Sequence, residues 1–406
     1  MRIFFAWELG GHLGHFARLL PVARRLRAEG HDVIFATPDP RSAAQVLTRE
    51  RFPHVAAPRL RRKTSTPAPV NFGDLLLQQG YGDFAGLLGL TQGWVGLLNL
   101  ARTDVLVADY APTALLAVRV ARIPAVTLAN GFQVPPRGNP TPPLRPADGV
   151  PEERLEKADH AALGGINRLL SRERRETLES VSDLFAAGPV LLATYPELDP
   201  WGPRYDVEYV GNLGDLGVTR DIDWPIGARP RILAYLSPEM ERLSEVLDAI
   251  SATAASALTV LPGASAQWCA SRSNEKVKVI SEPVQMERLI ASADLVVAHG
   301  GAGLTAQALI AGIPLALLPL QAEQALTANR VEAIGAGRTA RQPYSAADLR
   351  AAFLDVLRGA SYWEAAEAFA ARYAGWSREA AIARVVSLVK AAPLRCAGPV
   401  VAMGAQ

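Results

Sequence analysis

The sequence contains few cysteines and almost no excess of charge. Only two cysteines, Cys269 and Cys396, occur in 406 residues, far apart and in unlike contexts. This excludes a disulfide framework, gives no sign of a metal site, and fits a reducing compartment. The formal net charge is only +2, so bulk electrostatics gives no reason to expect a nucleic-acid partner.

The chain also lacks a segment typical of export or membrane insertion. Its start, MRIFFAWELGG, has one base and an apolar run of only five residues before Glu8, whereas a secretory signal needs a longer apolar core. Residues 294–320 are apolar and long enough to span a bilayer, but they contain a Gly-rich turn and Pro314, which a spanning helix rarely tolerates. We therefore expect a cytoplasmic protein without a membrane span. Its oligomeric state is not indicated.

What the sequence does contain is two similar series of strands and helices. Residues 2–7 and 32–38 read as buried strands around a helix with apolar residues at helical spacing, which ends at Gly30. Such β-α-β units build a doubly wound parallel sheet. The Gly-, Asp- and Pro-rich stretch that precedes a second series is typical of a linker. The expected boundaries are a first domain over 1–215, a linker over 216–229, a second domain over 230–385 and a loose tail over 386–406.

Polar residues in the second half follow the ends of predicted strands, where doubly wound sheets bind ligands. The strand DLVVA runs into His299 and a turn that contains Gly300, Gly301 and Gly303, followed by a helix. Glycines let a backbone approach an anion, and amides at a helix start point toward it. One strand later, a turn holds Glu323 and Gln324, a pair suited to sugar hydroxyls. Together these turns suggest a nucleotide-sugar site, although glycines at such a turn can equally serve helix–strand packing.

The stretch AHGGAGLTAQALIAGIPLALLPLQAEQALTANRV resembles the donor-binding motif of the family 1 glycosyltransferases, in particular the bacterial natural-product and macrolide branch. The N-terminal GHLGHFARLLPVARRLRAEGHDV resembles the start of the same family. The resemblance implies an α/β GT-B fold, with two Rossmann-like doubly wound domains facing across a cleft. It also implies an inverting, metal-independent transfer of a sugar from a UDP- or dTDP-sugar to a hydroxyl of a small, largely apolar acceptor. The nucleotide-sugar would be a co-substrate, and no cofactor or metal is expected.

The resemblance assigns the donor site residue by residue. His299 and the turn Gly300–Gly303, including Ala302, would hold the diphosphate, and Glu323 and Gln324 would hold the sugar hydroxyls. Four positions depart from the family pattern, and the first three of them leave the choice between UDP and dTDP open. At Leu304 the family often has a residue with a hydroxyl, and here only the neighbouring Thr305 has one. At Gln307 many members that use UDP-sugars have Glu, and at Met286 many have a Gln that faces the base. At Ser237 and Pro238 the family often has Gly-Ser.

In the first half, the family pattern places the catalytic base on His15 and its orienting acid on Asp109. His15 is expected at the start of the first helix, where the partial positive charge disfavours imidazolium and favours the neutral form that a base requires. A carboxylate on the far ring nitrogen would select the tautomer and stabilise the imidazolium that forms. Alone, either residue could equally be a helix cap.

The acceptor site is less well indicated. His12 could be an edge contact of the acceptor, and four aromatic residues could line its pocket, although aromatics at such spacing are more often core: Phe72, Tyr81, Phe84 and Trp94. The basic run Arg59–Lys63 suits a solvated loop, or a surface for an anionic acceptor or membrane. Two other functions stay open, a GT-B relative such as a sugar-nucleotide epimerase or lipid-intermediate transferase, and a non-catalytic auxiliary binding subunit.

Overall fold

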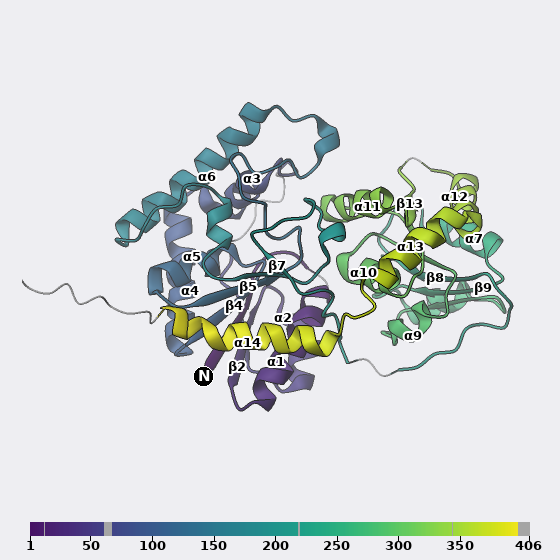
Figure 1. Ribbon diagram of the computed structural model, residues 1–406, viewed down its shortest axis with the longest axis horizontal. Coiled ribbons are helices and arrows are strands. Elements are labelled where there is room, and N and C mark those ends of the chain that lie inside the picture. The colour runs from purple at the N-terminus through teal and green to yellow at the C-terminus, as the bar shows by residue number, and fades with distance from the viewer. Residues whose placement is uncertain (12, 61–66, 218–219, 343, 397–406) are drawn as a thin grey trace, which may run out of the picture. The chain divides into compact units, whose positions relative to one another are not determined.

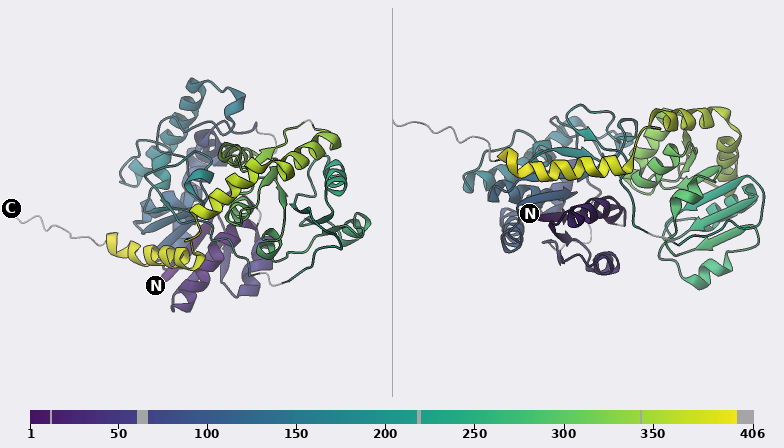
Figure 2. Two further views of the ribbon diagram at one scale, coloured as in Figure 1. Left: turned by 45° about the vertical axis from the view of Figure 1, so that its right-hand side comes forward. Right: turned by 60° about the horizontal axis from the view of Figure 1, so that its bottom comes forward.

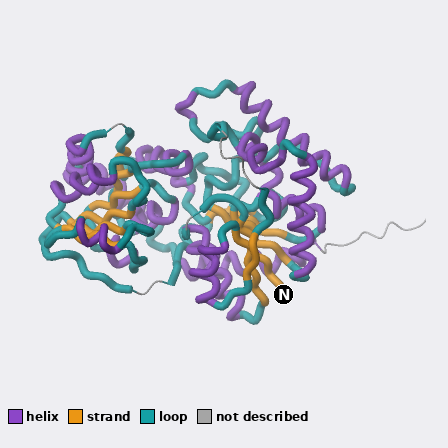
Figure 3. Tube along the Cα trace, turned by 180° about the vertical axis from the view of Figure 1, so that it is seen from behind, coloured by secondary structure: helices purple, strands orange, loops and turns teal. Residues whose placement is uncertain are grey.

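The computed structural model describes residues 1–11, 13–60, 67–217, 220–342 and 344–396. The chain divides into two compact α/β units (Figure 1). The first unit contains Met1–Ala193, Arg204–Leu216 and the chain from Ser377 on, and the second contains Thr194–Pro203 and Gly217–Trp376. Figure 3 shows that the strands of each unit are enclosed by helices.

The described part of the first unit has a seven-stranded parallel sheet in the order β3-β2-β1-β4-β5-β6-β7. Its strands are β1 (Arg2–Trp7), β2 (Asp32–Thr37), β3 (His54–Ala56), β4 (Val105–Asp109), β5 (Ala125–Ala129), β6 (Val190–Leu192) and β7 (Glu208–Tyr209). Its α-helices are α1 (Gly14–Ala28), α2 (Pro40–Ala43), α3 (Phe72–Leu76), α4 (Phe84–Leu100), α5 (Pro112–Ala121), α6 (Glu152–Arg172) and α14 (Arg378–Cys396). Short turns of other helix types are η1 (Ala44–Thr48), η2 (Leu77–Tyr81), η3 (Pro146–Asp148) and η4 (Ser182–Phe185).

The first β-α-β unit forms for the reasons that its sequence suggests. All five residues from Ile3 to Trp7 are buried, as expected for a strand covered by helices on both faces. The apolar positions of α1, among them Phe16, Leu19 and Ala23, are fully buried. The helix ends before Gly30, whose φ of +84° suits glycine. The prediction of a doubly wound sheet is therefore confirmed.

The described part of the second unit has a six-stranded parallel sheet in the order β10-β9-β8-β11-β12-β13. Its strands are β8 (Arg231–Tyr235), β9 (Ser256–Val260), β10 (Val277–Ile280), β11 (Leu295–Ala298), β12 (Leu315–Leu317) and β13 (Gly337–Thr339). Its helices are α7 (Leu243–Thr253), α8 (Ala266–Ser271), α9 (Met286–Ile290), α10 (Ala302–Ile310), α11 (Ala322–Ile334), α12 (Ala346–Arg358), α13 (Ala360–Arg372) and the single turn η5 (Pro196–Leu198).

Alternate side chains of these strands build two separate core layers. On one face of the sheet, which we call the α10 face, Leu233, Leu258 and Val296 pack with α9, α10, α11 and α13. On the other, the α7 face, Ala234 and Val297 pack with α7 and α12. This alternation along each strand assigns every strand residue to one face.

The first six strands of each unit have the same order, 3-2-1-4-5-6, and the direction in which strands are added reverses between the first and the fourth strand. In the first unit this switch point lies between β1 and β4, and in the second between β8 and β11. Open α/β sheets bind ligands at the carboxyl ends of the strands that flank such a point. Trp7 pairs with Asp109 at one switch point, and Tyr235 pairs with Ala298 at the other.

The boundaries of the units differ from the expected ones. Residues 386–396 do not form a loose tail, because α14 continues to Cys396 and buries Val385 and Val389. Figure 2 shows this helix lying along the first unit. Nη1 of Arg25 in α1 donates a hydrogen bond to Oε1 of Glu379 in α14 at 2.8 Å. Its apolar residues continue at helical spacing past residue 385, which favours a helix over a tail. Residues 397–406 lie outside the described chain.

Two segments near the expected linker pack with the second unit. Thr194–Pro203 belongs to it because the ring of Tyr195 packs against Phe369 and Tyr373. Gly217 and residues 220–229 also cluster with it, and Trp224 Nε1 donates a hydrogen bond to Ser292 Oγ at 2.9 Å. Among the described helices, none has the length and apolar character needed to cross a membrane.

Candidate active site

The predicted pair His15 and Asp109 meets at the switch point of the first sheet. His15 is the second residue of α1, and Asp109 is the last residue of β4. Nδ1 of His15 lies 3.0 Å from Oδ2 of Asp109, and both side chains are buried. Because an ionised carboxylate only accepts, Nδ1 carries the hydrogen of this bond. That tautomer leaves a lone pair on Nε2.

Arg18 is a third member of this site, and sequence reasoning missed it. Its Nη2 donates to Oδ1 of Asp109 at 2.6 Å and to Oε1 of Gln133 at 3.1 Å. Gln133 is itself held by Asn130, whose backbone amide donates to the same Oε1 at 2.9 Å. His15 and Arg18 lie three residues apart and so share a helix face, which was the only available signal in the sequence.

The charge of Arg18 sets the state of Asp109. Burial by itself would raise the pKa of Asp109, but the guanidinium of Arg18 and the ring of His15 hold that pKa below its ordinary value. The carboxylate therefore stays ionised in a site where its side chain has no solvent exposure. Oδ2 of Asp109 bonds His15 and Oδ1 bonds Arg18. The carboxylate can therefore orient His15 while Arg18 compensates its negative charge.

The ring of His15 is enclosed by Trp7 and by the Gly-rich turn. The Trp7 and His15 rings stack with centroids 4.3 Å apart and planes 16° from parallel. Gly10 has a φ of +81°, and a Cβ added there would lie 2.9 Å from Nε2 of His15. Only glycine suits both the conformation and the close approach. The turn therefore brings the Nε2 side of the ring against backbone without a side chain.

Glu8 is a second buried acid at this edge of the sheet, also missed from sequence. Its Oε2 accepts a hydrogen bond from the backbone amide of Thr113, in the first turn of α5, at 2.8 Å. The Thr113 hydroxyl lies 3.0 Å from the hydroxyl of Tyr81. Burial raises the pKa of Glu8 to about 7, against the opposing effect of the Thr113 hydrogen bonds. Its position one residue after a buried strand was a signal that sequence reasoning could have used.

Three of the four predicted acceptor aromatics are core residues. Phe72 and Trp94 have no exposed surface and Tyr81 has 1%. Phe72, for example, packs edge-on against Phe185 with centroids 5.6 Å apart. Such rings cannot contact a ligand in this conformation, so the core interpretation holds for them. They lie in three different elements, α3, η2 and α4, and the packing of these elements places them inside.

Three other predictions about the acceptor region, concerning Phe84, His12 and the basic run, are not tested by the described residues. The partly buried ring of Phe84 lies 4.0 Å from the guanidinium carbon of Arg168, with which it forms a cation–π contact. His12 lies outside the described residues, as does Arg61–Lys63 of the basic run. Arg59 is exposed and donates to the carbonyl of Pro38 at 3.3 Å.

In the second unit, His299 connects strand ends and does not point a free donor at a ligand. Its Nε2 accepts from the backbone amide of Ser237 at 2.7 Å, which leaves Nδ1 as the donor to the carbonyl of Leu318, also at 2.7 Å. The expectation that His299 donates directly to a diphosphate is therefore wrong for this arrangement. Sequence could not reveal this, because both partners come from other turns.

The glycines of the donor turn fall into two classes. Gly300 has a φ of +90°, and a Cβ added there would lie 2.7 Å from the carbonyl oxygen of Gln324. It is therefore required by packing. Gly301 and Gly303 are different, because an added Cβ would meet nothing within 4 Å. These two leave open space beside the start of α10, where no side chain caps the helix.

The remaining predicted donor residues lie near the starts of α9, α10 and α11 or just after β8. Leu304 and Met286 are partly buried against the α10 face. Thr305 is fully buried, so its hydroxyl does not reach a ligand beside the turn. Gln324 Oε1 accepts from the backbone amide of Leu320 at 2.8 Å. Other predicted residues are partly buried in the same places: Ser237, Ala302, Gln307 and Glu323.

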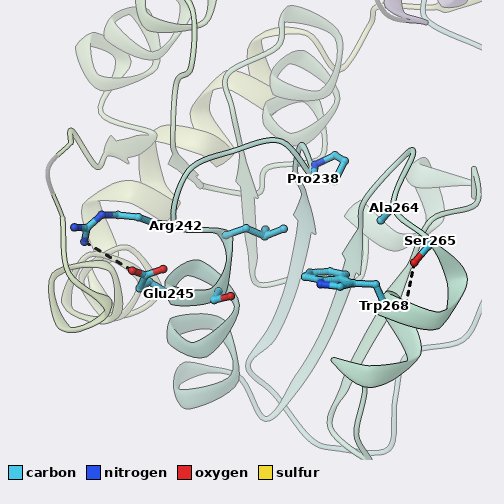
Figure 4. Close-up of a pocket in the computed structure, with 8 residues that line it drawn as sticks. Pro238, Arg242, Glu245, Ala264, Ser265 and Trp268 are labelled. Atoms are coloured by element: carbon cyan, nitrogen blue, oxygen red, sulfur yellow. Dashed lines mark hydrogen bonds and ion pairs between the residues drawn. The ribbon is translucent and has the colours of Figure 1, made fainter.

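A separate groove opens on the α7 side of the same sheet edge (Figure 4). It has a volume of about 600 Å³ and is lined by Pro238, Arg242, Leu243, Ser244, Glu245, Ala264, Ser265 and Trp268. None of the predicted donor residues lines it. Among the described residues, no group of three or more His, Cys, Asp or Glu side chains has the arrangement of a metal site.

The second unit also matches a known family. Residues 244–387 match the family model described as Erythromycin biosynthesis protein CIII-like, C-terminal domain. The solved structure of the glycosyltransferase VinC in complex with dTDP is similar over 96% of this chain and 100% of that one, with a TM-score of 0.69 at 16% identity. The chain has the GT-B fold.

Other comparisons agree with this fold. The spinosyn rhamnosyltransferase SpnG in complex with thymidine diphosphate covers 95% of this GT-B chain and 100% of its own, with a TM-score of 0.64 and 18% identity. A sequence relative, the NDP-glycosyltransferase YjiC of Bacillus subtilis (strain 168), is 43% identical over 58 residues. That match spans 14% of this chain and only 15% of the relative.

Proposed function

We propose that this GT-B protein is an inverting glycosyltransferase that moves a sugar from a nucleoside diphosphate to a hydroxyl of a small, largely apolar acceptor. The observation that carries the proposal is the buried set of His15, Asp109 and Arg18 at the switch point of the first sheet. A second supports it, the glycine turn at the start of α10, with open space beside Gly301 and Gly303.

His15 is the general base of this proposal. With Nδ1 donating to Asp109, Nε2 can take the proton of an acceptor hydroxyl. The ionised carboxylate of Asp109 stabilises the imidazolium that forms. Arg18 touches neither reactant in the proposal; it is a positioning residue that keeps Asp109 ionised. The acceptor oxygen then attacks the anomeric carbon opposite the nucleotide, the carbon–diphosphate bond breaks, and the configuration inverts.

The start of α10 is the proposed diphosphate site. Backbone amides in the first turn of a helix carry partial positive charge and stabilise an anion. The departing diphosphate gains negative charge as the bond breaks, so these amides favour the transition state. His299 acts here by holding the ends of β8 and β11 together. Glu323 is proposed to accept hydrogen bonds from sugar hydroxyls, and no step of the proposal is routed through a metal.

Thymidine diphosphate is the nucleotide that we expect to bind best. The similar structures of VinC and SpnG are complexes with that nucleotide. The test is to titrate the full chain with dTDP, UDP, GDP and ADP in turn and to measure each binding affinity by calorimetry. Gly301→Val should weaken dTDP binding at least tenfold, because it fills the space beside α10. Gly375→Val is the matched control, since an added Cβ there also meets nothing within 4 Å. Equal dTDP affinity in both variants would contradict the proposed donor site.

The base is tested once a donor and an acceptor support turnover. His15→Ala should lower kcat by at least a hundredfold, which is the lower range for a lost general base, while dTDP affinity stays unchanged. His160→Ala, at an exposed histidine of the same unit, is the control and should keep full activity. A fully active His15→Ala variant would refute the assignment. Inverted configuration at the anomeric carbon of the product is a separate requirement.

A further inference from the structure

Tyr235 is a large side chain that reaches solvent from the carboxyl end of a central strand. It is the last residue of β8, at the switch point of the second sheet. The three residues before it, Ile232, Leu233 and Ala234, are fully buried. Tyr235 is 37% exposed. An aromatic ring partly open to solvent at such an edge calls for an explanation, because edges of this kind bind ligands.

The register of the sheet places Tyr235 in one row with its neighbours. It pairs with Val260 of β9 and with Ala298 of β11, and Ala298 pairs in turn with Leu317. These three partners are at most 2% exposed. In parallel strands, side chains in register point to the same face. Tyr235 is therefore the one member of this row that projects beyond the core.

The face of the sheet limits which side chains can lie around the ring. Val260, Ala298 and Leu317 all belong to the α10 face. Met286 at the start of α9 and Leu304 in the first turn of α10 pack against this same face and are partly buried. The groove of Figure 4 lies on the opposite, α7 face, since Leu243 of its lining packs there. The Tyr235 ring thus emerges on the side of the sheet where both helix starts lie.

We propose that Tyr235 binds the nucleoside of the donor, with its ring as a platform for the base or ribose beside Met286 and Leu304. The inference rests on the proposed function, because it needs the diphosphate at the start of α10. A nucleoside attached to a diphosphate beside Gly301 extends along the strand ends, and β8 is the next strand from β11. Aromatic rings stack on any base, and the thioether and leucine supply apolar contact at its edges.

The site would explain the departures from the family pattern at Met286 and Leu304. Neither Met286 nor Leu304 can form the hydrogen bonds of an amide or a hydroxyl, so neither recognises polar groups of the nucleoside. A tyrosine at residue 235 supplies both stacking area and one hydroxyl. Nucleoside recognition at this site would therefore depend on Tyr235 more than on either neighbour.

The experiment compares a nucleotide with its diphosphate alone. Calorimetry on the full chain measures the binding of dTDP, and inorganic pyrophosphate is titrated as a competitor of dTDP. Tyr235→Ala should weaken dTDP binding at least tenfold, which lies within the range that loss of one stacked base costs. The affinity of pyrophosphate should stay within twofold. Tyr235→Phe keeps the ring and should lose less than fivefold, whereas Tyr235→Leu keeps apolar volume without an aromatic face and should behave like alanine.

The controls separate the possible failures. Tyr205→Ala removes a fully exposed tyrosine of the first unit and should change neither affinity. If Gly301→Val abolishes dTDP binding while Tyr235→Ala and Tyr235→Leu bind dTDP like the unsubstituted protein, the donor site stands and the role of Tyr235 is refuted. Parallel loss of dTDP and pyrophosphate in Tyr235→Leu would also overturn it, because a purely structural role predicts that. If the unsubstituted protein binds neither ligand, the proposed function itself fails.

Discussion

Replacing Arg18 with methionine should destabilise the first unit strongly. The variant keeps the apolar stem of the side chain but leaves Asp109 without its cation. Arg18 and Asp109 are 2.6 Å apart, and their side chains are 10% and 0% exposed. Removing one partner of a buried ion pair typically costs about 3 to 5 kcal/mol, because the remaining charge stays buried. We expect a loss of that size at pH 7, measured by urea unfolding of the first unit.

The loss should depend on pH in a direction that the structure determines. Asp109 has a folded-state pKa below its ordinary value of 3.8. Such a group contributes stability above that value and loses it as the pH falls through the folded-state pKa. The difference in the free energy of unfolding between Arg18→Met and the unsubstituted protein should therefore be largest at pH 7 and should decrease as the pH falls into the acid range. Urea midpoints at several pH values test this.

A double-mutant cycle shows whether the two residues act as a pair. Asp109→Asn alone leaves Arg18 as a buried, uncompensated cation and should also destabilise. The double variant removes both charges, so its cost should fall short of the sum of the single costs by roughly 2 kcal/mol or more. Additive costs, or a loss in Arg18→Met below about 1 kcal/mol, would refute the view that Arg18 holds Asp109 ionised.

Three further predictions concern other groups of the two units. Glu8→Gln should stabilise the protein by about 3 kcal/mol at pH 8 but by no more than about 1 kcal/mol at pH 5, because a carboxyl whose pKa rises from 4.5 to about 7 on folding opposes folding once it must ionise. Urea midpoints at both pH values measure the effect, and equal midpoint shifts would contradict it. Gly73→Ala should cost on the order of 1 to 3 kcal/mol, since the new Cβ would lie 2.3 Å from Oδ1 of Asp159; an unchanged melting temperature would refute this. Gly300→Ala should weaken dTDP binding and lower the melting temperature, because φ is +90° and the carbonyl of Gln324 lies 2.7 Å from the added Cβ.

Matched glycines control for these last two substitutions. Gly89 lies inside α4, and a Cβ there would meet nothing within 4 Å, so Gly89→Ala should be neutral or slightly stabilising. Gly301 precedes α10 with a φ of −63° that alanine readily adopts. Gly301→Ala should therefore leave the melting temperature unchanged. If either control loses as much stability as its partner, the steric argument is wrong.

Several features could be predicted because they depend on local order in the chain. The strand, turn and helix around His15 follow from apolar spacing and from glycines at the turn. The glycine-rich turn after β11, the proposed diphosphate site, was recognisable for the same reason. Its individual roles were less predictable: the sequence of residues 299–303 does not distinguish Gly300, which packing requires, from Gly301, which leaves space open.

The aromatic residues of the acceptor region illustrate the opposite case. Phe72 and Trp94 occur in Leu- and Gly-rich segments that suit either a pocket or a core, and only packing assigns them to the core. Periodicity reports which face of a helix is apolar, and it does not report whether that apolar face meets a ligand or another helix.

The amino-acid sequence by itself determined two doubly wound units, and it indicated His15 as the proposed base and residues 299–303 as the proposed anion-binding turn, because these features depend on residue order over short spans. Only the tertiary structure decided which groups complete each site. Arg18 reaches Asp109 across 91 positions, and Ser237 reaches His299 across 62. The position of Tyr235 at the switch point becomes apparent only when β8 is paired with β11. Parallel strands bring such residues together through crossovers of many residues, so their proximity is a property of the sheet and not of any local pattern.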